Sequence, residues 1–252
     1  RPAACAAQDG STPWMKTAGP PYRSLNPMAS ERVLAKRAAL RLRIIEEALA
    51  AFAARGFEAT TMTDIADRLQ MTGPALYHYF ATKDALLFAC LDQMLDHLLA
   101  EVARAAAGDD APAHRLARVV RAQVALEIRQ GSAASLVNAH LYGPRYLTEA
   151  LLAPQRETLR IKQRELVQVY RSLIDEGIAA GQFMPTATAI AAFNVLAIVQ
   201  YSGVWYRPRK GRRAADVIEA QSAAVLSLLS VPAPGAMATP HQRPTPARTS
   251  RS

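Results

Sequence analysis

The sequence predicts an all-α protein with a small N-terminal helical domain followed by a larger helical domain, about nine helices in all. Two observations favour helix over sheet: alanine and leucine dominate the apolar residues, and aromatic residues make up only 6% of the chain. A third is that apolar residues recur at helical spacing through most of the sequence. With 252 residues, half of them hydrophobic, the chain is long enough to bury a sizeable core.

Four segments are expected along the chain. The ends, residues 1–30 and 231–252, are rich in Pro, Ala, Ser and Thr and are predicted to be disordered, because they bury too little apolar surface to offset the entropy of ordering. Residues 31–82 form a predicted helix-turn-helix domain. Residues 83–230 form the larger domain.

The first three helices are predicted from their end signals. Helical apolar spacing covers Glu31 to Phe57, and a glycine precedes Phe57 where the helix has to stop. Thr61, with an aspartate three residues later, predicts a capping box that starts a short second helix. Thr72 is expected to cap a third helix, which carries Pro74 in its first turn, where a missing N–H costs little.

The larger domain begins with a long amphipathic helix that Thr82 is expected to cap. Beyond Gly108, glycines and prolines separate further helical stretches. The predicted helices are 112–130, 132–142, 144–181, 186–206 and 213–230. The stretch 187–206 is nearly long enough to span a bilayer, but polar residues interrupt it, and a buried interface helix is the preferred interpretation.

Composition narrows the classes of function. A net charge of +9 favours an anionic partner. The charge alone does not distinguish between a nucleic acid, a membrane and an acidic ligand. The basic residues are dispersed rather than gathered on one amphipathic face, which argues against a membrane-surface protein. Cys5 and Cys90 are the two cysteines and predict neither a disulfide framework nor a zinc site, so a reducing compartment, the cytoplasm, is expected.

An enzyme is not expected. The five histidines form no metal-ligand spacing with acids or cysteines, and there is no glycine-rich phosphate loop. Asp92, Asp96 and His97 share a helix, but acids at such positions are ordinarily the solvated face of an amphipathic helix. No cofactor and no metal is expected.

Two short helices joined by a turn at residues 70–72 match a helix-turn-helix in spacing, although any three-helix bundle shows the same spacing. The residues are more specific. The run Gly56-Phe57, Thr60-Thr61, Ile65-Ala66 and Met71-Thr72, continued by Leu76 to Leu87, resembles the N-terminal signature of TetR-family repressors over about fifty residues. In this interpretation Leu76, Phe80, Ile65 and Phe57 are core residues.

The resemblance implies a set of DNA contacts. Thr61 and the amides at the start of the second helix would hold one phosphate strand, and Tyr77, Tyr79 and Lys83 the other. For both tyrosines, a hydroxyl that points outward only for solvation is the alternative. Base readout would then fall to Thr72, Gly73, Pro74 and His78.

Two features lie beside this motif. The family usually has glycine in the turn where this sequence has Gln70, and a non-glycine residue in a left-handed conformation costs about 1 kcal/mol. In the basic segment before the motif, Lys36 and Arg37 are expected to contact DNA, whereas a solvated helix face is an equal alternative for Arg41 and Arg43.

The C-terminal part, from Ala180-Gly181-Gln182-Phe183 to Trp205-Tyr206-Arg207-Pro208, resembles TetR regulators of fatty-acid and sterol catabolism, which respond to acyl-CoA thioesters. An acyl-CoA or a related hydrophobic carboxylate is therefore the expected effector. The apolar faces of the last two helices predict a homodimer. Candidate effector contacts are Asn138, Tyr142, Tyr146, Tyr170, Tyr201 and Trp205, for each of which simple core packing is the alternative.

The protein is therefore expected to be a ligand-responsive transcriptional regulator that binds double-stranded operator DNA as a homodimer. No association with a membrane is expected. Release of a repressor by effector is the preferred mechanism, and activation stays open. The alternative in another class is an effector-binding helical protein whose helix-turn-helix binds no specific operator. The operator, the regulated genes and the effector's identity are beyond what the sequence determines.

Overall fold

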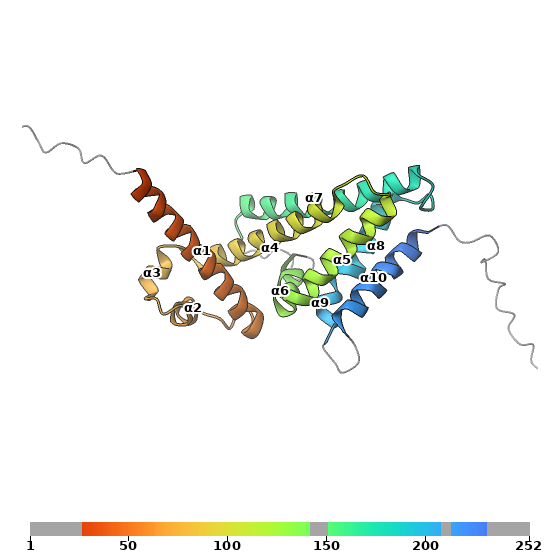
Figure 1. Ribbon diagram of the computed structural model, residues 1–252. Helices are drawn as coiled ribbons and strands as arrows, with labels where there is room; N and C mark the ends of the chain where they lie inside the picture. Colours follow the sequence, from red (N-terminus) through yellow and green to blue (C-terminus); the bar gives the residue numbers. More distant parts are fainter. Residues whose placement is uncertain (1–26, 142–150, 208–212, 231–252) are drawn as a thin grey trace, which may run out of the picture. The chain divides into compact units, whose positions relative to one another are not determined.

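The computed structural model describes residues 27–141, 151–207 and 213–230, and these form ten helices (Figure 1). The chain divides into two units, residues 1–42 and 43–252. The expected disordered ends, apart from residues 27–30, lie outside the described residues, as do Tyr142 and Tyr146. The all-α prediction is confirmed: the described residues contain one isolated β-bridge, Phe183 with Ser230, and no strand.

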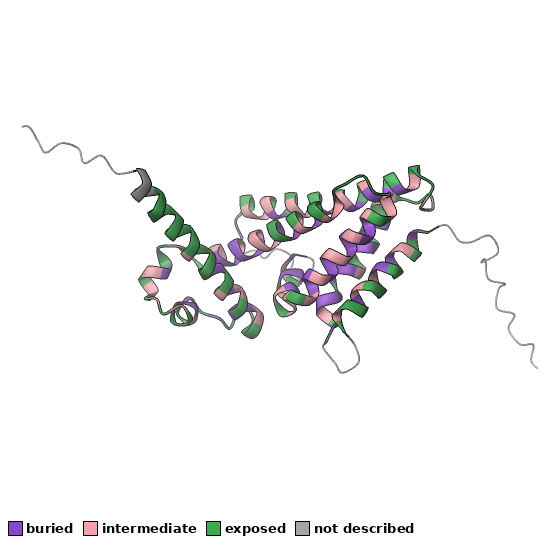
Figure 2. Ribbon diagram, viewed as in Figure 1, coloured by how far each residue is buried: buried purple, intermediate pink, exposed green. Residues whose placement is uncertain are grey.

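The N-terminal helices begin and end close to the predicted residues. They are α1 (Pro27–Arg55), α2 (Met62–Arg68), α3 (Gly73–Tyr77) and α4 (Lys83–Ala106). The helix α1 begins four residues earlier than expected, inside the segment predicted to be disordered, because proline fits the first helical position, where its missing N–H needs no partner. Residues 31–39 of α1 are exposed, and Figure 2 shows this part of the helix in green.

The larger domain contains α5 (Pro112–Gln130), α6 (Ser132–Leu141), α7 (Ala153–Ala179), α8 (Thr188–Gln200), α9 (Ser202–Trp205) and α10 (Ala214–Leu229). The helix α5 is central, because it packs against α4 and against each of α6 to α10. Much of its surface is buried in consequence (Figure 2).

Two expected helices differ in the structure. The predicted helix 144–181 is observed as α7, which starts at Ala153 with Pro154 in its first turn. The predicted helix 186–206 is interrupted at Tyr201, so it forms α8 and the short α9, and this raises the number of helices to ten. The stretch Thr188–Trp205 is long and apolar enough to cross a membrane by length and composition, and 44% of it is buried in the protein.

The close approach of α9 to α5 depends on Gly203. A Cβ atom at this position would lie 2.5 Å from the backbone oxygen of Glu127, which belongs to a helix and cannot move aside cheaply. We expect Gly203→Ala to destabilise the protein by about 1–3 kcal/mol, as overpacking does. Thermal denaturation checks this, with Gly73→Ala as the control, because a Cβ at Gly73 meets nothing within 4 Å. Equal melting temperatures for the two variants would contradict the expectation.

Candidate nucleic-acid interface and regulatory cavity

The helix-turn-helix is built by the three predicted threonine caps. The Thr61 hydroxyl accepts from the Asp64 N–H at 3.1 Å, while the Asp64 carboxylate accepts from the Thr61 backbone N–H at 2.8 Å, which completes the capping box. The hydrogen bonds that the Asp64 carboxylate accepts from the backbone N–H and the hydroxyl of Thr61, with Arg55 nearby, lower the pKa of Asp64 to about 2. Thr72 and Thr82 likewise accept from the amides of Ala75 and Ala85. The starts of α2, α3 and α4 are therefore fixed by local hydrogen bonds.

The packing of the four expected core residues is confirmed. Leu76 and Ile65 are fully buried, and Phe80 and Phe57 are nearly so. The ring of Phe57 meets that of Phe52 at 5.1 Å between centroids, edge to face. Leu76 in particular fixes α3, whose other side remains accessible.

The turn between α2 and α3 contains the one non-glycine residue with positive φ among the described residues, Gln70 at φ 54°. This is the position where the sequence departs from the family's usual glycine. We expect Gln70→Gly to stabilise the protein by about 0.5–1 kcal/mol, because glycine adopts this conformation without strain but loses more entropy on folding. Gln70→Ala keeps the strain and is the matched control in thermal denaturation. A melting temperature no higher for glycine than for alanine would contradict this.

The edge of α3 exposes most of the residues expected to read DNA. Thr72, Pro74, Tyr77 and His78 are exposed, Tyr77 by 53%, and Gly73 is half-buried with open space where a side chain would lie. The backbone can therefore approach a groove closely here. Tyr79 is half-buried, with its ring 5.9 Å from that of His78. Thr61 is exposed at the start of α2, where first-turn amides lack intrahelical acceptors.

Lys83 has an intramolecular role that the sequence did not reveal. Its ammonium donates to the backbone oxygen of Phe57 at 3.0 Å and to that of Glu58 at 3.4 Å, and lies 4.3 Å from the centre of the Phe57 ring. Lys83 thus ties the start of α4 to the turn after α1. An ammonium has three N–H donors, so phosphate contact at this site stays a prediction.

Lys36 and Arg37 both lie on exposed positions of α1, within the unit of residues 1–42. Their expected contact with DNA stays a prediction. Asp96 is exposed, as expected for a solvated face of α4, and Asp92 is half-buried; both also lie within ion-pair distance of Lys162 on α7, at 2.6 and 2.5 Å. This ion-pair cluster links α4 to α7.

A small cavity lies inside the larger domain, between α4, α5, α6 and α8. Its volume is about 20 Å³, and its walls are mainly apolar, with Glu127, Gln130, Asn138 and Gln200 as the polar exceptions. Of the six expected effector contacts, Asn138 lines this cavity. Tyr170 is fully buried nearby, and its hydroxyl donates to Gln123 Oε1 at 2.7 Å.

Sequence reasoning missed Gln123, Glu127 and Gln200. A signal was present in α5, because Gln123 and Glu127 continue the buried stripe of Leu116 and Val120 at helical spacing. Polar residues in such a stripe mark a buried polar site. Among the described residues, no group of three His, Cys, Asp or Glu side chains could hold a metal ion.

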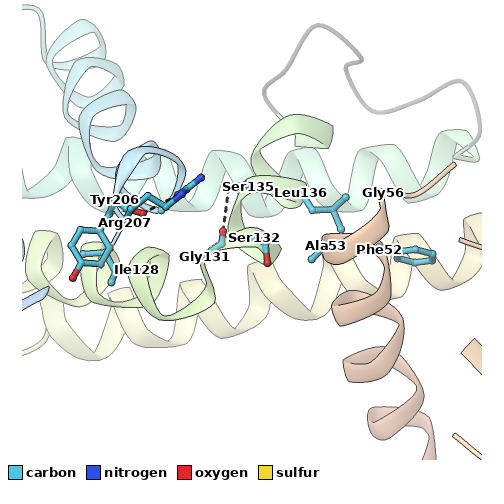
Figure 3. A pocket seen from close by; sticks show the side chains of 11 residues that line it. Phe52, Ala53, Gly56, Ile128, Gly131, Ser132, Ser135, Leu136, Tyr206 and Arg207 are labelled. Carbon is cyan, nitrogen blue, oxygen red and sulfur yellow. Dashed lines mark hydrogen bonds between the residues drawn. The ribbon is translucent and has the colours of Figure 1, made fainter. Parts of the chain in front are cut away.

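A larger open groove of about 650 Å³ lies between the end of α1, the α5–α6 turn and α9 (Figure 3). Phe52, Gly56, Ser132 and Tyr206 are among its lining residues, and Arg207 is held there by the backbone oxygens of Val204 and Tyr206. This groove adjoins the helix that leads into the helix-turn-helix.

Tyr201 and Trp205 lie outside the cavity, 52% and 46% exposed on the α8–α9 surface. Ile190 and Phe193 of α8 and Leu228 of α10 are also more than half exposed. Large apolar side chains gathered on the last helices are typical of an interface between protomers.

The fold and these surfaces define a DNA-binding regulatory protein, with a capped helix-turn-helix joined to a helical domain that contains a cavity. Comparison with known families agrees. Residues 44–90 match the family described as "Bacterial regulatory proteins, tetR family", and residues 109–229 match "Tetracyclin repressor-like, C-terminal domain". Together these matches span about two thirds of the chain. The chain belongs to the TetR family of bacterial transcriptional regulators.

Individual relatives support the same class. The HTH-type transcriptional repressor KstR2 of Mycobacterium tuberculosis is 29% identical over 182 residues, which cover 71% of this chain and 86% of that repressor. A TetR/AcrR-family regulator from Thermobifida fusca has a similar structure, with a TM-score of 0.60, 28% identity, and coverage of 75% of this chain and 97% of that one. AibR, solved with isovaleryl coenzyme A and operator DNA, shares the fold at a TM-score of 0.64, 24% identity, and coverage of 75% and 97%. These relatives are transcriptional regulators, not enzymes.

Proposed function

We propose that this protein is a cytoplasmic repressor that binds operator DNA as a homodimer and is released by an apolar effector, with an acyl-CoA as the first candidate. The observation that carries the proposal is the exposed edge of α3, from Thr72 to His78, presented by three capped helices. Short residues and accessible polar side chains at the start of a recognition helix are what major-groove readout requires.

The proposed effector site is the cavity beside α4. Met94, Leu95 and Leu98 of α4 form part of its wall, and the same helix begins at Lys83, which is tied to the turn after α1. Because the cavity has the size of about one water molecule, an effector has to displace α4 side chains in order to enter. A displaced α4 would then move the helix-turn-helix.

Repression would be lifted by a shift in population. The effector favours a dimer whose two recognition helices no longer match successive major grooves, which are about 34–36 Å apart on B-DNA. The ion-pair cluster of Lys162 with Asp92 and Asp96 would hold α4 in its DNA-binding position until the effector enters. An acyl-CoA fits the resemblance of the C-terminal part to acyl-CoA-responsive regulators, and AibR was solved with one.

The test is a titration of the protein against its own upstream promoter fragment at several salt concentrations, repeated with saturated and unsaturated acyl-CoAs. We expect a Kd of about 10 nM or tighter with a steep salt dependence, and release by one acyl-CoA. If the protein binds the operator but no acyl-CoA affects this binding, acyl-CoAs are rejected as the effector class, and the proposal of a DNA-binding regulator stands. Equal affinity for operator and random DNA would favour the alternative, an effector-binding protein without a specific operator.

A further inference from the structure

Four polar side chains meet in the core of the larger domain: Gln123 and Glu127 of α5, Asn138 of α6 and Tyr170 of α7. Each is less than a tenth exposed. Tyr170 donates to Gln123 Oε1, while Asn138 Nδ2 donates to the backbone oxygen of Gln200 at 2.9 Å and to Glu127 Oε2 at 3.4 Å. We call these four residues the core polar cluster.

The core polar cluster is incompletely satisfied. Gln123 Nε2 is buried and lies within hydrogen-bond geometry of no described residue, although the Gln123 amide is close enough to the Glu127 carboxyl to lower the pKa of that group. Glu127 is buried among the side-chain amides of Asn138 and Gln123, and no cation of the described residues acts on it. Its pKa is raised to about 7, because burial disfavours the charged form. Buried polar groups normally have partners, so an incomplete set beside a cavity indicates a ligand.

The wall of the cavity contains both apolar and polar residues. Leu95, Leu98 and Leu126 are among its apolar wall residues, and Glu127 and Asn138 bring the core polar cluster to its surface. Met94, also in the wall, is flexible enough to make room. An effector in this cavity would therefore contact apolar side chains as well as the core polar cluster.

We propose that the core polar cluster binds an uncharged oxygen of the effector, a carbonyl or a hydroxyl, attached to an apolar body. This inference rests on the proposed function, because it takes the cavity as the effector site, and it specifies which chemical group the site recognises. The carbonyl of a thioester belongs to this class, whereas a free carboxylate does not.

Burial of the site decides against the two other end groups. A carboxylate would be buried next to Glu127 without a neighbouring cation, which is unfavourable. An ammonium could pair only with an ionised Glu127, and burial disfavours that form. An uncharged oxygen accepts from the protonated form of Glu127, which lines the cavity and which burial favours.

The test uses four small probes of similar length, 2-heptanone, heptane, hexanoate and hexylamine, with binding to the full-length protein measured by calorimetry at pH 7. We expect the ketone to bind at least about tenfold tighter than each of the others, since a site built for a polar group discriminates strongly. Tightest binding of the amine would overturn the proposal in favour of a cation site. Equal affinities, or no binding of the ketone at millimolar concentration, would show that the cluster is only structural.

The variant Glu127→Gln sharpens the test, because it keeps the shape and removes the charge. We expect it to bind hexanoate at least fivefold tighter than the wild type does while the ketone changes less than threefold. Glu165→Gln, an exposed position on α7, is the matched control and should change neither. An unchanged hexanoate affinity in a folded Glu127→Gln protein would contradict the role of Glu127.

The two proposals fail in different ways. Operator binding and its release by acyl-CoA are measured without these probes, so a protein that is released by acyl-CoA but does not prefer the ketone rejects only the inference on the core polar cluster. A protein that prefers the ketone but binds no specific operator rejects only the proposed function.

Discussion

Replacing Tyr77 and His78 together by alanine is expected to lower the affinity for the operator by about 100-fold or more, at an almost unchanged melting temperature. Both side chains are exposed on the edge of α3, so their removal costs little packing. A well-placed base contact contributes about 1–3 kcal/mol of discrimination, and the loss of a phosphate contact adds to it. Fluorescence anisotropy with operator and random DNA, at fixed salt, measures the effect.

The single variants separate the two expected roles. His78→Ala should reduce the preference for operator over random DNA, because it removes a base contact, whereas Tyr77→Phe should weaken both alike, because a phosphate contact carries no sequence information. His114→Ala, exposed on α5, is the control and should leave both affinities unchanged. Full operator affinity in the double variant would exclude this edge of α3 from the interface.

Replacing Phe193 by glutamate is expected to convert the dimer into a monomer and to weaken operator binding by about 100-fold or more. Phe193 is 61% exposed on α8, and Ile190, about one helical turn earlier, is 63% exposed. Burying a carboxylate in a two-fold interface places two like charges close together without partners, which strongly disfavours association. A monomer contacts one half-site and loses the gain from simultaneous binding of two.

Sedimentation measures the oligomeric state, and anisotropy measures operator binding at the same protein concentration. The matched control is Ile161→Glu, because Ile161 is also an exposed apolar residue, 44% accessible, but lies on α7. A dimeric Phe193→Glu protein would place the interface elsewhere. A monomer with full operator affinity would reject dimeric binding to DNA.

The threonine caps show why much of the DNA-binding half could be predicted. Each cap is a hydrogen bond between residues three apart, such as Thr61 with Asp64, so the chemistry and its spacing are both visible in the sequence. The strained turn at Gln70 was predictable for the same reason, because its conformation is a property of one position. The exposed edge of α3 then followed from which residues the apolar spacing assigned to the core.

The effector side was predicted less completely. Asn138 and Tyr170 were among the expected contacts, and both belong to the core polar cluster, but Tyr201 and Trp205 lie on the surface instead. An aromatic or polar residue within an apolar helix has the same sequence pattern whether it faces a cavity or a partner protomer. Only the packing of α8 against α5 decides which face of α8 is buried in the domain and which face is exposed.

By itself the sequence determined most of the helices, the three threonine caps, the helix-turn-helix and the family, since these depend on residues close together in the chain. The tertiary structure decided which distant residues meet: Lys83 with the Phe57 carbonyl, Lys162 with Asp92 and Asp96, and Tyr170 with Gln123. These partners are 26 to 70 positions apart. The physical reason is that helical periodicity fixes the orientation of a side chain on its own helix, whereas the partner across the interface depends on how whole helices pack.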